Sequence, residues 1–371
     1  MVYPLEPIRS AYYLVIRMNY DISENPKYNK RKLWLDGDVT LQRFDSVKFP
    51  KLELYEEVAR GYYWTPEEIS LTKDKQDFKT ASKAEKHMYT SNLLRQTTLD
   101  SFQNPIEVFG KCASVPELKN LLLNWSFFES NIHSRAYSHI IRNVYSNPSE
   151  IFDNIHNIQP IVDMVASIGK YYDVLDSANH NPFIEPYEHK KHIWKALHAS
   201  YALEAIRFIV SFATSLGMME NGLFVGNGAE ISLILQDELL HTEWTAEIIK
   251  LTKNDPDFKQ IEIELETEVY DIYLDVIREE KEWAEYLFKE GVVVGLNAKI
   301  LSQFVDWTAY EKLKLVGIKY LDDRPLTHPI PWYLKHSEVD KKQTALQETE
   351  STSYVIGAMT DAFNLSELPN I

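Results

Sequence analysis

The chain has few of the residues that crosslink small proteins or interrupt regular structure. Its 371 residues include one cysteine, 12 glycines and 16 prolines. A single cysteine excludes a disulfide framework and any cysteine-rich zinc or iron–sulfur site, and it favours a reducing compartment, so we expect a cytoplasmic protein. The low glycine and proline content excludes a low-complexity chain rich in those residues. A chain of this length can bury a sizeable core without crosslinks.

Basic charge and long apolar runs are also scarce. The 39 Lys and Arg residues stand against 55 Asp and Glu, which gives a formal net charge of −16. Nucleic acid is therefore not expected as a primary partner, because phosphate binding needs a basic face. The N-terminal segment lacks the regions of a secretory signal. The apolar stretch 208–218 is well short of the roughly 20 residues that a membrane-spanning helix needs, so no membrane partner is expected.

Alternating polar and apolar residues between hairpin turns are missing too, which predicts little sheet. Instead, apolar residues recur at three- and four-residue steps within long windows that have few prolines. These windows are 83–104, 117–145, 193–214, 230–251, 258–288 and 297–316. Helices of this length joined by modest loops favour one bundle over separate domains. We therefore predict one all-α core that extends from about residue 50 to about residue 320.

Acidic residues and histidines interrupt the apolar pattern of these helices. Taken singly, each is explained as a solvated carboxylate or a satisfied histidine. As a set, they match the ligand pattern of carboxylate-bridged dimetal bundles, in which two helices give a Glu/His pair and two others give one carboxylate. Oxygen-rich ligation with one imidazole per metal suits iron or manganese, and cations would offset the repulsion between buried carboxylates. The residues are Asp100, Glu129, His133, Glu204, Glu238 and His241.

The segments that carry these residues resemble the class I ribonucleotide reductase small subunit, which generates a radical. The resemblance covers nearly the whole chain, from about residue 45 to residue 371, and the segments that carry it are LDSFQ, NIHSRAYSHIIRN, ALEAIRFIVSFA, DELLH, GYYWTPEEI and HPIPW. It implies an all-α, ferritin-like long-helix bundle with a carboxylate-bridged dimetal site and a flexible C-terminal tail. It also implies an N-terminal extension (1–45), a ferritin-like radical-generating domain (46–337) and a tail that docks the large subunit (338–371).

The resemblance assigns roles to the metal ligands and to the residues around them. One metal would be bound by Asp100, Glu129 and His133, and the other by Glu204, Glu238 and His241, with carboxylates bridging. The family implies two iron ions activated by O₂, with manganese as an alternative. Tyr137 would bear the radical, because it lies one helical turn after the first histidine. Shielding of that radical is implied for three apolar residues that ordinary core packing explains equally well: Phe208, Phe212 and Ile234.

A route for electrons and protons is implied as well. Trp64, Asp237 and His133 match the family's path to and from the metals, and Asp237 could accept the second ring N–H of that histidine. The composition of the tail alone predicts disorder. By the resemblance, its residues Glu348, Glu350 and Tyr354 form a mobile relay to the large subunit, and the final NLSELPNI is the docking peptide. The implied partners are this large subunit and, as a homodimer, a second copy of the chain.

One spacing departs from the family pattern. The family's first Glu/His pair reads E-x-x-H, but here three residues separate Glu129 from His133, and Ser130 stands at the usual Glu position. Either a one-residue π-bulge absorbs the insertion and Glu129 still ligates, or Ser130 takes the ligand position and that metal site is altered. The first interpretation is favoured because such bulges often occur at functional sites and every other ligand is present.

Three functions follow from these patterns. The leading one is the small subunit of ribonucleoside-diphosphate reductase, which would generate a tyrosyl radical and lend it to the large subunit for making deoxyribonucleotides, the precursors of DNA. A stand-alone ferritin-like dimetal oxidase is a second, but Tyr137, Trp64 and Tyr354 count against it because such an enzyme exports no radical. An inactive or metal-altered scaffold subunit is the third, and only the spacing of Glu129 and His133 favours it.

Overall fold

A computed structural model describes residues 30–37, 42, 44–293, 295–321 and 327–337. Within these ranges the only sheet-like features are two isolated bridges, Trp34 with Ala113 and Val293 with Leu296. The predicted all-α bundle is therefore confirmed. Its α-helices are α1 (Pro50–Gly61), α2 (Thr72–Thr80), α3 (Lys83–Phe102), α4 (Pro105–Phe109), α5 (Pro116–Phe127), α6 (Ser134–Val144), α7 (Pro148–Asp153), α8 (Gln159–His180), α9 (Pro186–Ala202), α10 (Ile209–Glu220), α11 (Val225–Thr252), α12 (Pro256–Glu264), α13 (Glu266–Leu287), α14 (Ala298–Leu315) and α15 (Leu334–Ser337).

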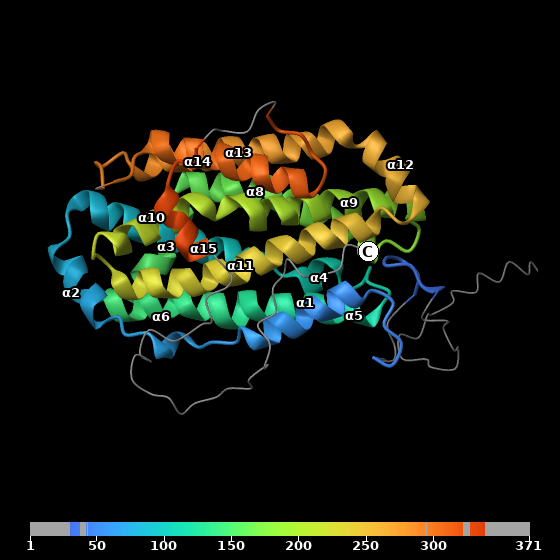
Figure 1. Cartoon of the computed structure of the whole chain (residues 1–371), viewed down its shortest axis with the longest axis horizontal. Coiled ribbons are helices and arrows are strands. Elements are labelled where there is room, and N and C mark those ends of the chain that lie inside the picture. Colours follow the sequence, from blue (N-terminus) through green and yellow to red (C-terminus); the bar gives the residue numbers. More distant parts are fainter. Residues whose placement is uncertain (1–29, 38–41, 43, 294, 322–326, 338–371) are drawn as a thin grey trace, which may run out of the picture.

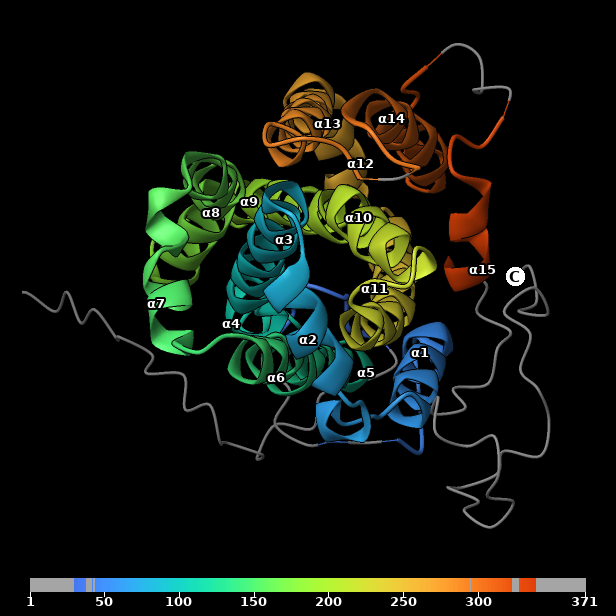
Figure 2. The same cartoon turned by 90° about the vertical axis from the view of Figure 1, so that its left-hand side faces the viewer.

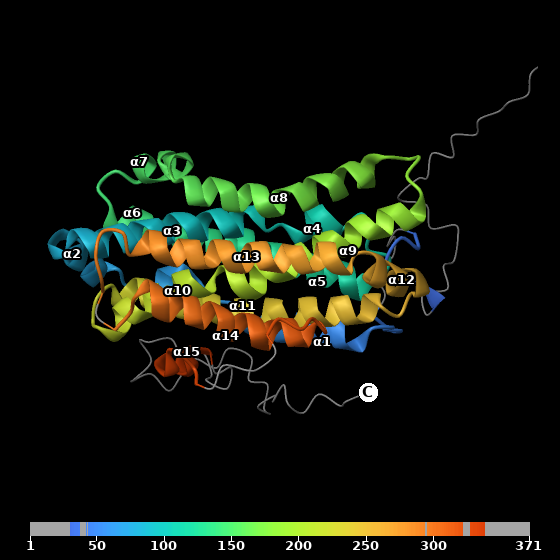
Figure 3. The ribbon, with the colours of Figure 1, turned by 90° about the horizontal axis from the view of Figure 1, so that it is seen from above.

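The long helices lie side by side along the longest axis of the molecule (Figure 1). Helix α3 packs against α6, α8 and α10, and α11 packs against α9 and α10 (Figure 2). Helices α13 and α14 lie next to each other and cover α9 and α10 from outside (Figure 3). Further helices thus surround the interior between α3, α6, α10 and α11, and they separate the side chains there from solvent.

Two of the long helices contain a π-helical turn. Helices α5 and α6 are joined by η3 (Phe128–His133), so residues 116–144 are helical throughout. Helices α9 and α10 are joined in the same way by η5 (Leu203–Arg207). The short 3₁₀ turns η2 (Pro66–Glu68), η4 (Ile155–Asn157) and η6 (Pro331–Tyr333) lie outside these helices. The predicted windows 117–145 and 193–214 fall within these two interrupted helices.

Local sequence explains where two of the site-bearing helices begin. Helix α3 starts with a capping box, in which Ser82 Oγ accepts from the Glu85 N–H and the Glu85 carboxylate accepts from the Ser82 N–H. Helix α11 is capped by buried Asp74 of α2, whose carboxylate accepts the N–H groups of Gly226 and Asn227 at 2.9 and 2.7 Å. A Cβ at Gly226 would lie 2.6 Å from the carbonyl oxygen of Ser70, so only glycine permits this approach.

The structure differs from the predicted windows in two places. The window 258–288 is two helices, since α12 ends at Glu264 and α13 begins at Glu266. Helix α8 was not among the predicted windows. It contains Gly169, where a Cβ would lie 2.8 Å from the ring of Phe102. Glycine is unfavourable within a helix, but here its lack of a side chain allows α8 to approach α3.

One helical stretch of the described ranges, Pro186–Glu220, which includes the π-helical turn η5, is long and apolar enough to cross a membrane. Its apolar window is 94% buried inside the bundle, as expected for a core helix. Trp34, within the predicted N-terminal extension, is also part of the core, because its Nε1–H donates to Thr252 Oγ1 at 2.8 Å. The boundaries at residues 45 and 338 remain predictions, and residues 1–29 and 338–371 lie outside the described ranges.

Candidate metal centre

Four helical segments bring six acidic and imidazole side chains together in the middle of the bundle. Each of these side chains is at most 3% exposed. Their ligand-type atoms form two groups, and within each group the atoms lie within 4.8 Å of one another. The first group is Asp100, Glu129, His133 and Glu238, and the second is Glu129, Glu204, Glu238 and His241. Glu129 and Glu238 belong to both groups, as carboxylates that bridge two metals would.

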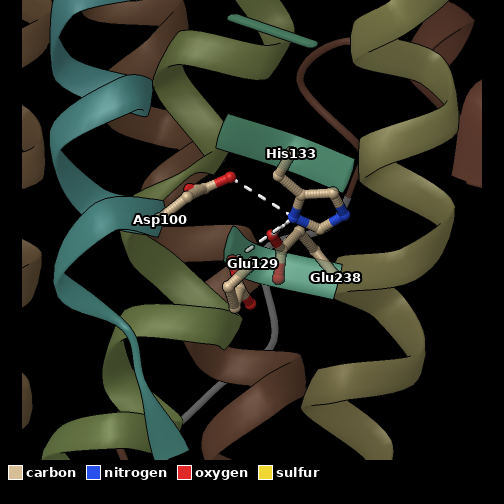
Figure 4. Close-up of side chains that lie close together, drawn as sticks. All are labelled: Asp100, Glu129, His133 and Glu238. Carbon is tan, nitrogen blue, oxygen red and sulfur yellow. Dashed lines mark hydrogen bonds and ion pairs between the residues drawn. The ribbon is translucent and has the colours of Figure 1, made fainter. Parts of the chain in front are cut away.

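The imidazole of His133 lies among three carboxylates of the first group (Figure 4). Its Nδ1 is 3.3 Å from Asp100 Oδ2, 3.3 Å from Glu129 Oε2 and 3.2 Å from Glu238 Oε1. A ring nitrogen carries at most one hydrogen, so it cannot donate to all three oxygens. Oxygen atoms from three carboxylates and one ring nitrogen that lie this close together are instead the arrangement expected around a bound cation.

The second imidazole has the same surroundings. His241 Nδ1 lies 3.0 Å from Glu129 Oε1, 3.3 Å from Glu204 Oε2 and 3.0 Å from Glu238 Oε2. In the described part of the chain, both oxygens of Asp100 and one each of Glu204 and Glu238 accept no hydrogen bond. Buried carboxylate oxygens without a donor need another partner, and two divalent cations fit this donor set.

The charges of the cluster support the same conclusion. Burial raises the pKa of Asp100 and of Glu204 well above the usual range, and the neighbouring carboxylates raise both further. Burial acts on Glu238 in the same sense, but His241 beside it holds the pKa of Glu238 below the usual value. Burial would lower the pKa of His133 and His241, yet the surrounding carboxylates raise both. Without cations the cluster thus retains protons, which metal ions would displace.

The π-helical turn η3 explains how Glu129 reaches the site. The backbone N–H of Ser134 donates to the carbonyl of Glu129, five residues earlier, and its Oγ donates to the same oxygen at 2.8 Å. The extra residue is therefore contained within one turn, which confirms the predicted π-bulge. Ser130 is exposed on the surface, whereas Glu129 is fully buried. The turn therefore places Glu129, and not Ser130, in the two groups that could hold metal ions.

The predicted outer contacts are also present. Asp237 Oδ2 lies 3.0 Å from His133 Nε2 and accepts the Nε1–H of Trp64 at 2.9 Å. All three side chains are buried, so Trp64, Asp237 and His133 form one continuous line of contacts that ends at the first ligand group. Such a carboxylate fixes the ring of a metal-binding histidine and leaves the other nitrogen free to ligate.

Two residues that contact the predicted ligands were not found from the sequence. Trp125 Nε1–H donates to Glu129 Oε1 at 3.1 Å. Gln103 donates to Glu204 Oε1 and to Ser200 Oγ, and its own carbonyl accepts from Tyr172 at 2.6 Å. Trp125 lies four residues before Glu129 on the same helical face, which is a signal that could have indicated it. Nothing in the sequence links Gln103 to Glu204.

The predicted radical residue lies beside the first ligand group. Tyr137 is fully buried, and burial, followed by the charges of Asp100 and Glu238, raises the pKa of its phenol well above the usual value. Phe208 and Phe212 are buried and stack on each other with ring centroids 5.1 Å apart, and Ile234 is buried too. Their role as a shield stays a prediction. The predicted relay residues Glu348, Glu350 and Tyr354 lie outside the described residues.

Comparisons with known proteins agree on one family. The family model described as "Ribonucleotide reductase, small chain" matches residues 44–321. The ribonucleoside-diphosphate reductase subunit beta of Buchnera aphidicola subsp. Schizaphis graminum is 35% identical over 95% of this chain and 99% of that protein. Ribonucleoside-diphosphate reductase 1 subunit beta of Salmonella typhimurium is 34% identical over 92% of this chain and 96% of that protein. The solved ribonucleotide reductase R2 subunit from Clostridium botulinum, 22% identical, has the same fold, with a TM-score of 0.76 over 86% of this chain and 98% of that chain.

Proposed function

Because the chain belongs to the ribonucleotide reductase small-chain family, we propose that it oxidises Tyr137 at its dimetal site and lends the radical to a large subunit. The chain is a ribonucleoside-diphosphate reductase subunit beta with a buried carboxylate–histidine cluster. The observation that carries the proposal is the position of Tyr137, a buried phenol beside Asp100 of the first ligand group. The alternative of an inactive or metal-altered scaffold loses its one support, because Glu129 reaches the cluster despite the unusual spacing.

Iron is the metal we propose, with manganese as the alternative. Both accept carboxylate oxygens and imidazole nitrogens in this proportion, and the ligands alone do not separate them. Asp100, Glu129 and His133 would hold one ion, and Glu204, Glu238 and His241 the other, with Glu129 and Glu238 able to reach both. Two bound iron ions would supply oxidising power drawn from O₂.

The chain's own residues would then handle one electron and one proton. Tyr137 loses both when it becomes a neutral radical, and we assign the proton to the carboxylate of Asp100, whose charge acts on the phenol. Complete burial of Tyr137 keeps water and external reductants away from the product. We assign the same protective role to the buried residues Phe208, Phe212 and Ile234.

A second electron path would lead through Trp64. Its indole N–H donates to Asp237, and that carboxylate also contacts His133, so the three groups can pass an electron and adjust a proton in one line. The carboxylate keeps a hydrogen on Nε2 of His133 and thereby leaves Nδ1 for the metal. We propose that this line continues through Tyr354 and Glu348 to the large subunit, and that the functional assembly contains two copies of this chain in the cytoplasm.

A reductase assay tests the proposal. Metal-free protein is loaded with Fe(II) in the presence of O₂, mixed with a ribonucleotide reductase large subunit, and supplied with a ribonucleoside diphosphate and a thiol reductant. We expect deoxyribonucleoside diphosphate to form only with the loaded chain, and Tyr137→Phe to bind metal but give no product. A Mn(II)-loaded sample compares the two metals. Equal product from Tyr137→Phe would contradict the proposed radical site.

A further inference from the structure

The helix that carries Glu204 is interrupted and then begins again. The π-helical turn η5 ends at Arg207, and α10 begins at Ile209. A helix that starts anew leaves its first N–H groups without a partner inside the helix. Phe212 is bonded to the carbonyl of Phe208 at 2.8 Å, whereas the N–H of Val210 donates to Glu280 Oε1 of α13 at 3.0 Å. A carboxylate from a separate helix therefore caps the restart.

This carboxylate is completely buried and has a buried cationic partner. Glu280 is 0% exposed and forms an ion pair with Arg95 of α3, which is 1% exposed. The guanidinium of Arg95 also lies 4.7 Å from the ring centroid of Trp283, and the Nε1–H of Trp283 donates to Ser211 Oγ at 3.0 Å. The four side chains Arg95, Glu280, Trp283 and Ser211 thus connect α3, α10 and α13 next to η5.

Stability alone is a weak explanation for this pair. Removing two charges from water costs free energy that their attraction often fails to recover, and apolar replacements of buried ion pairs are often neutral or stabilising. The pair does something that an apolar pair cannot do, because it supplies an acceptor for the Val210 N–H. That bond satisfies a backbone N–H in the first turn of α10, next to the junction with η5. Glu204 lies in η5, with its Oε2 3.3 Å from His241 Nδ1.

We propose that Arg95 and Glu280 are positioning residues that hold η5 in the shape that directs Glu204 at the metal. This inference rests on the proposed function, in which Glu204 is a ligand. The carboxylate oxygen that accepts from the Val210 N–H is the part of Glu280 that acts on Glu204, and Arg95 serves to hold that carboxylate in place. The metal at Glu204 and His241 depends on this arrangement, and the metal at Asp100 and His133 does not.

A matched pair of double variants separates the effect of the oxygen that accepts from Val210 from the effect of the two buried charges. R95M/E280Q and R95M/E280L both remove the two charges together, so neither leaves a buried charge unpaired. The glutamine keeps an oxygen that can accept from Val210, and the leucine removes it. Lys281→Gln is the neighbouring control, because Lys281 follows Glu280 on α13 and pairs with Asp306 of α14 at 2.6 Å. Thermal unfolding of the metal-free variants shows which are folded.

The readout is the stepwise affinity of the metal-free protein for two Mn(II) ions, measured by equilibrium dialysis with EPR of the free ion. In R95M/E280L we expect one Mn(II) to bind about 10- to 100-fold more weakly, the usual effect of losing a group that supports a ligand, and the other to bind as in wild type. R95M/E280Q and Lys281→Gln should bind both ions like the wild type. Unchanged binding of both ions in folded R95M/E280L would overturn the proposal.

A third variant covers the case in which R95M/E280L does not fold. Glu280→Asp keeps the charge opposite Arg95 but withdraws the acceptor from Val210 by one methylene, and we expect the same selective loss of one Mn(II). Wild-type affinity for both ions in this variant would overturn the proposal as well. A wild-type protein that binds fewer than two Mn(II) ions would instead contradict the proposed function, so the two failures are distinguishable.

Discussion

Deleting Ser130 tests how the chain accommodates the extra residue between Glu129 and His133. In an uninterrupted helix, one added or missing residue turns everything beyond it by about 100° and shifts it by about 1.5 Å, which moves a Cα atom sideways by about 3.5 Å. The π-helical turn η3 already contains one residue more than an α-helical turn needs. Deleting Ser130, which is exposed, should convert η3 to an α-helical turn and leave Glu129 and His133 on one face.

Deleting Arg135 is the matched control, because this residue is also exposed but lies in α6 beyond the π-helical turn. Its loss would rotate the part of α6 that follows, whose buried residues include Tyr137, Ile140, Ile141 and Val144. Exposing four such side chains costs about 1.5–3 kcal/mol each, about 6–12 kcal/mol together, which is comparable with the whole stability of a folded protein. Deleting Ser130 should change stability by only about 1 kcal/mol, as expected for one surface residue and one hydrogen bond.

Urea unfolding of the metal-free proteins and the number of metals bound per chain measure both effects. We expect the Ser130 deletion to fold and to bind two metals, and the Arg135 deletion to be unfolded or insoluble. If both deletions destabilise the protein equally, the extra residue is not contained in η3 and the argument for Glu129 as a ligand fails.

Three further predictions concern single side chains. Glu129→Ala should bind fewer than two metals per chain by elemental analysis, and two retained metals would show that Glu129 is not a ligand. Trp64→Phe, which loses the N–H donor to Asp237, should bind two metals but pass electrons to the site more slowly in stopped-flow measurements; an unchanged rate would exclude Trp64 from the route. Burial raises the pKa of Glu230 from 4.5 to about 7, so the native state retains its proton and loses stability as the pH rises through that window. Glu230→Gln should therefore gain up to about 3 kcal/mol relative to wild type between pH 4.5 and pH 8, and parallel urea-unfolding stabilities over this range would contradict this.

The sequence predicted the bundle and the ligand set, because both leave local marks. Long windows of three- and four-residue apolar spacing predicted the helices, and the Glu/His pairs stood out within them. The π-helical turn η3 was predictable because a Glu/His pair with one residue too many reveals an insertion. The turn η5 was not predicted, since Glu204 has no ligand partner on its own helix against which an irregular spacing could be noticed.

Contacts between distant residues account for most of what the sequence did not show. Arg95 and Glu280 are 185 residues apart, and each alone is an ordinary charged residue in a helix. The same holds for Gln103, which meets Glu204 only because α3 and η5 are neighbours in the fold. Helix α8 was missed for a related reason, because Gly169 weakens its helical pattern and is explained only by the ring of Phe102 from α3.

The most direct test of the proposed chemistry is an EPR spectrum of the protein after Fe(II) and O₂ are added to the metal-free chain. The wild type should bind two irons and show a tyrosyl radical signal. Tyr137→Phe should bind the same two irons and lack that signal, since the phenol beside Asp100 is the group oxidised. An unchanged tyrosyl signal in Tyr137→Phe, or a wild type that holds two irons and gives no radical, would contradict the account.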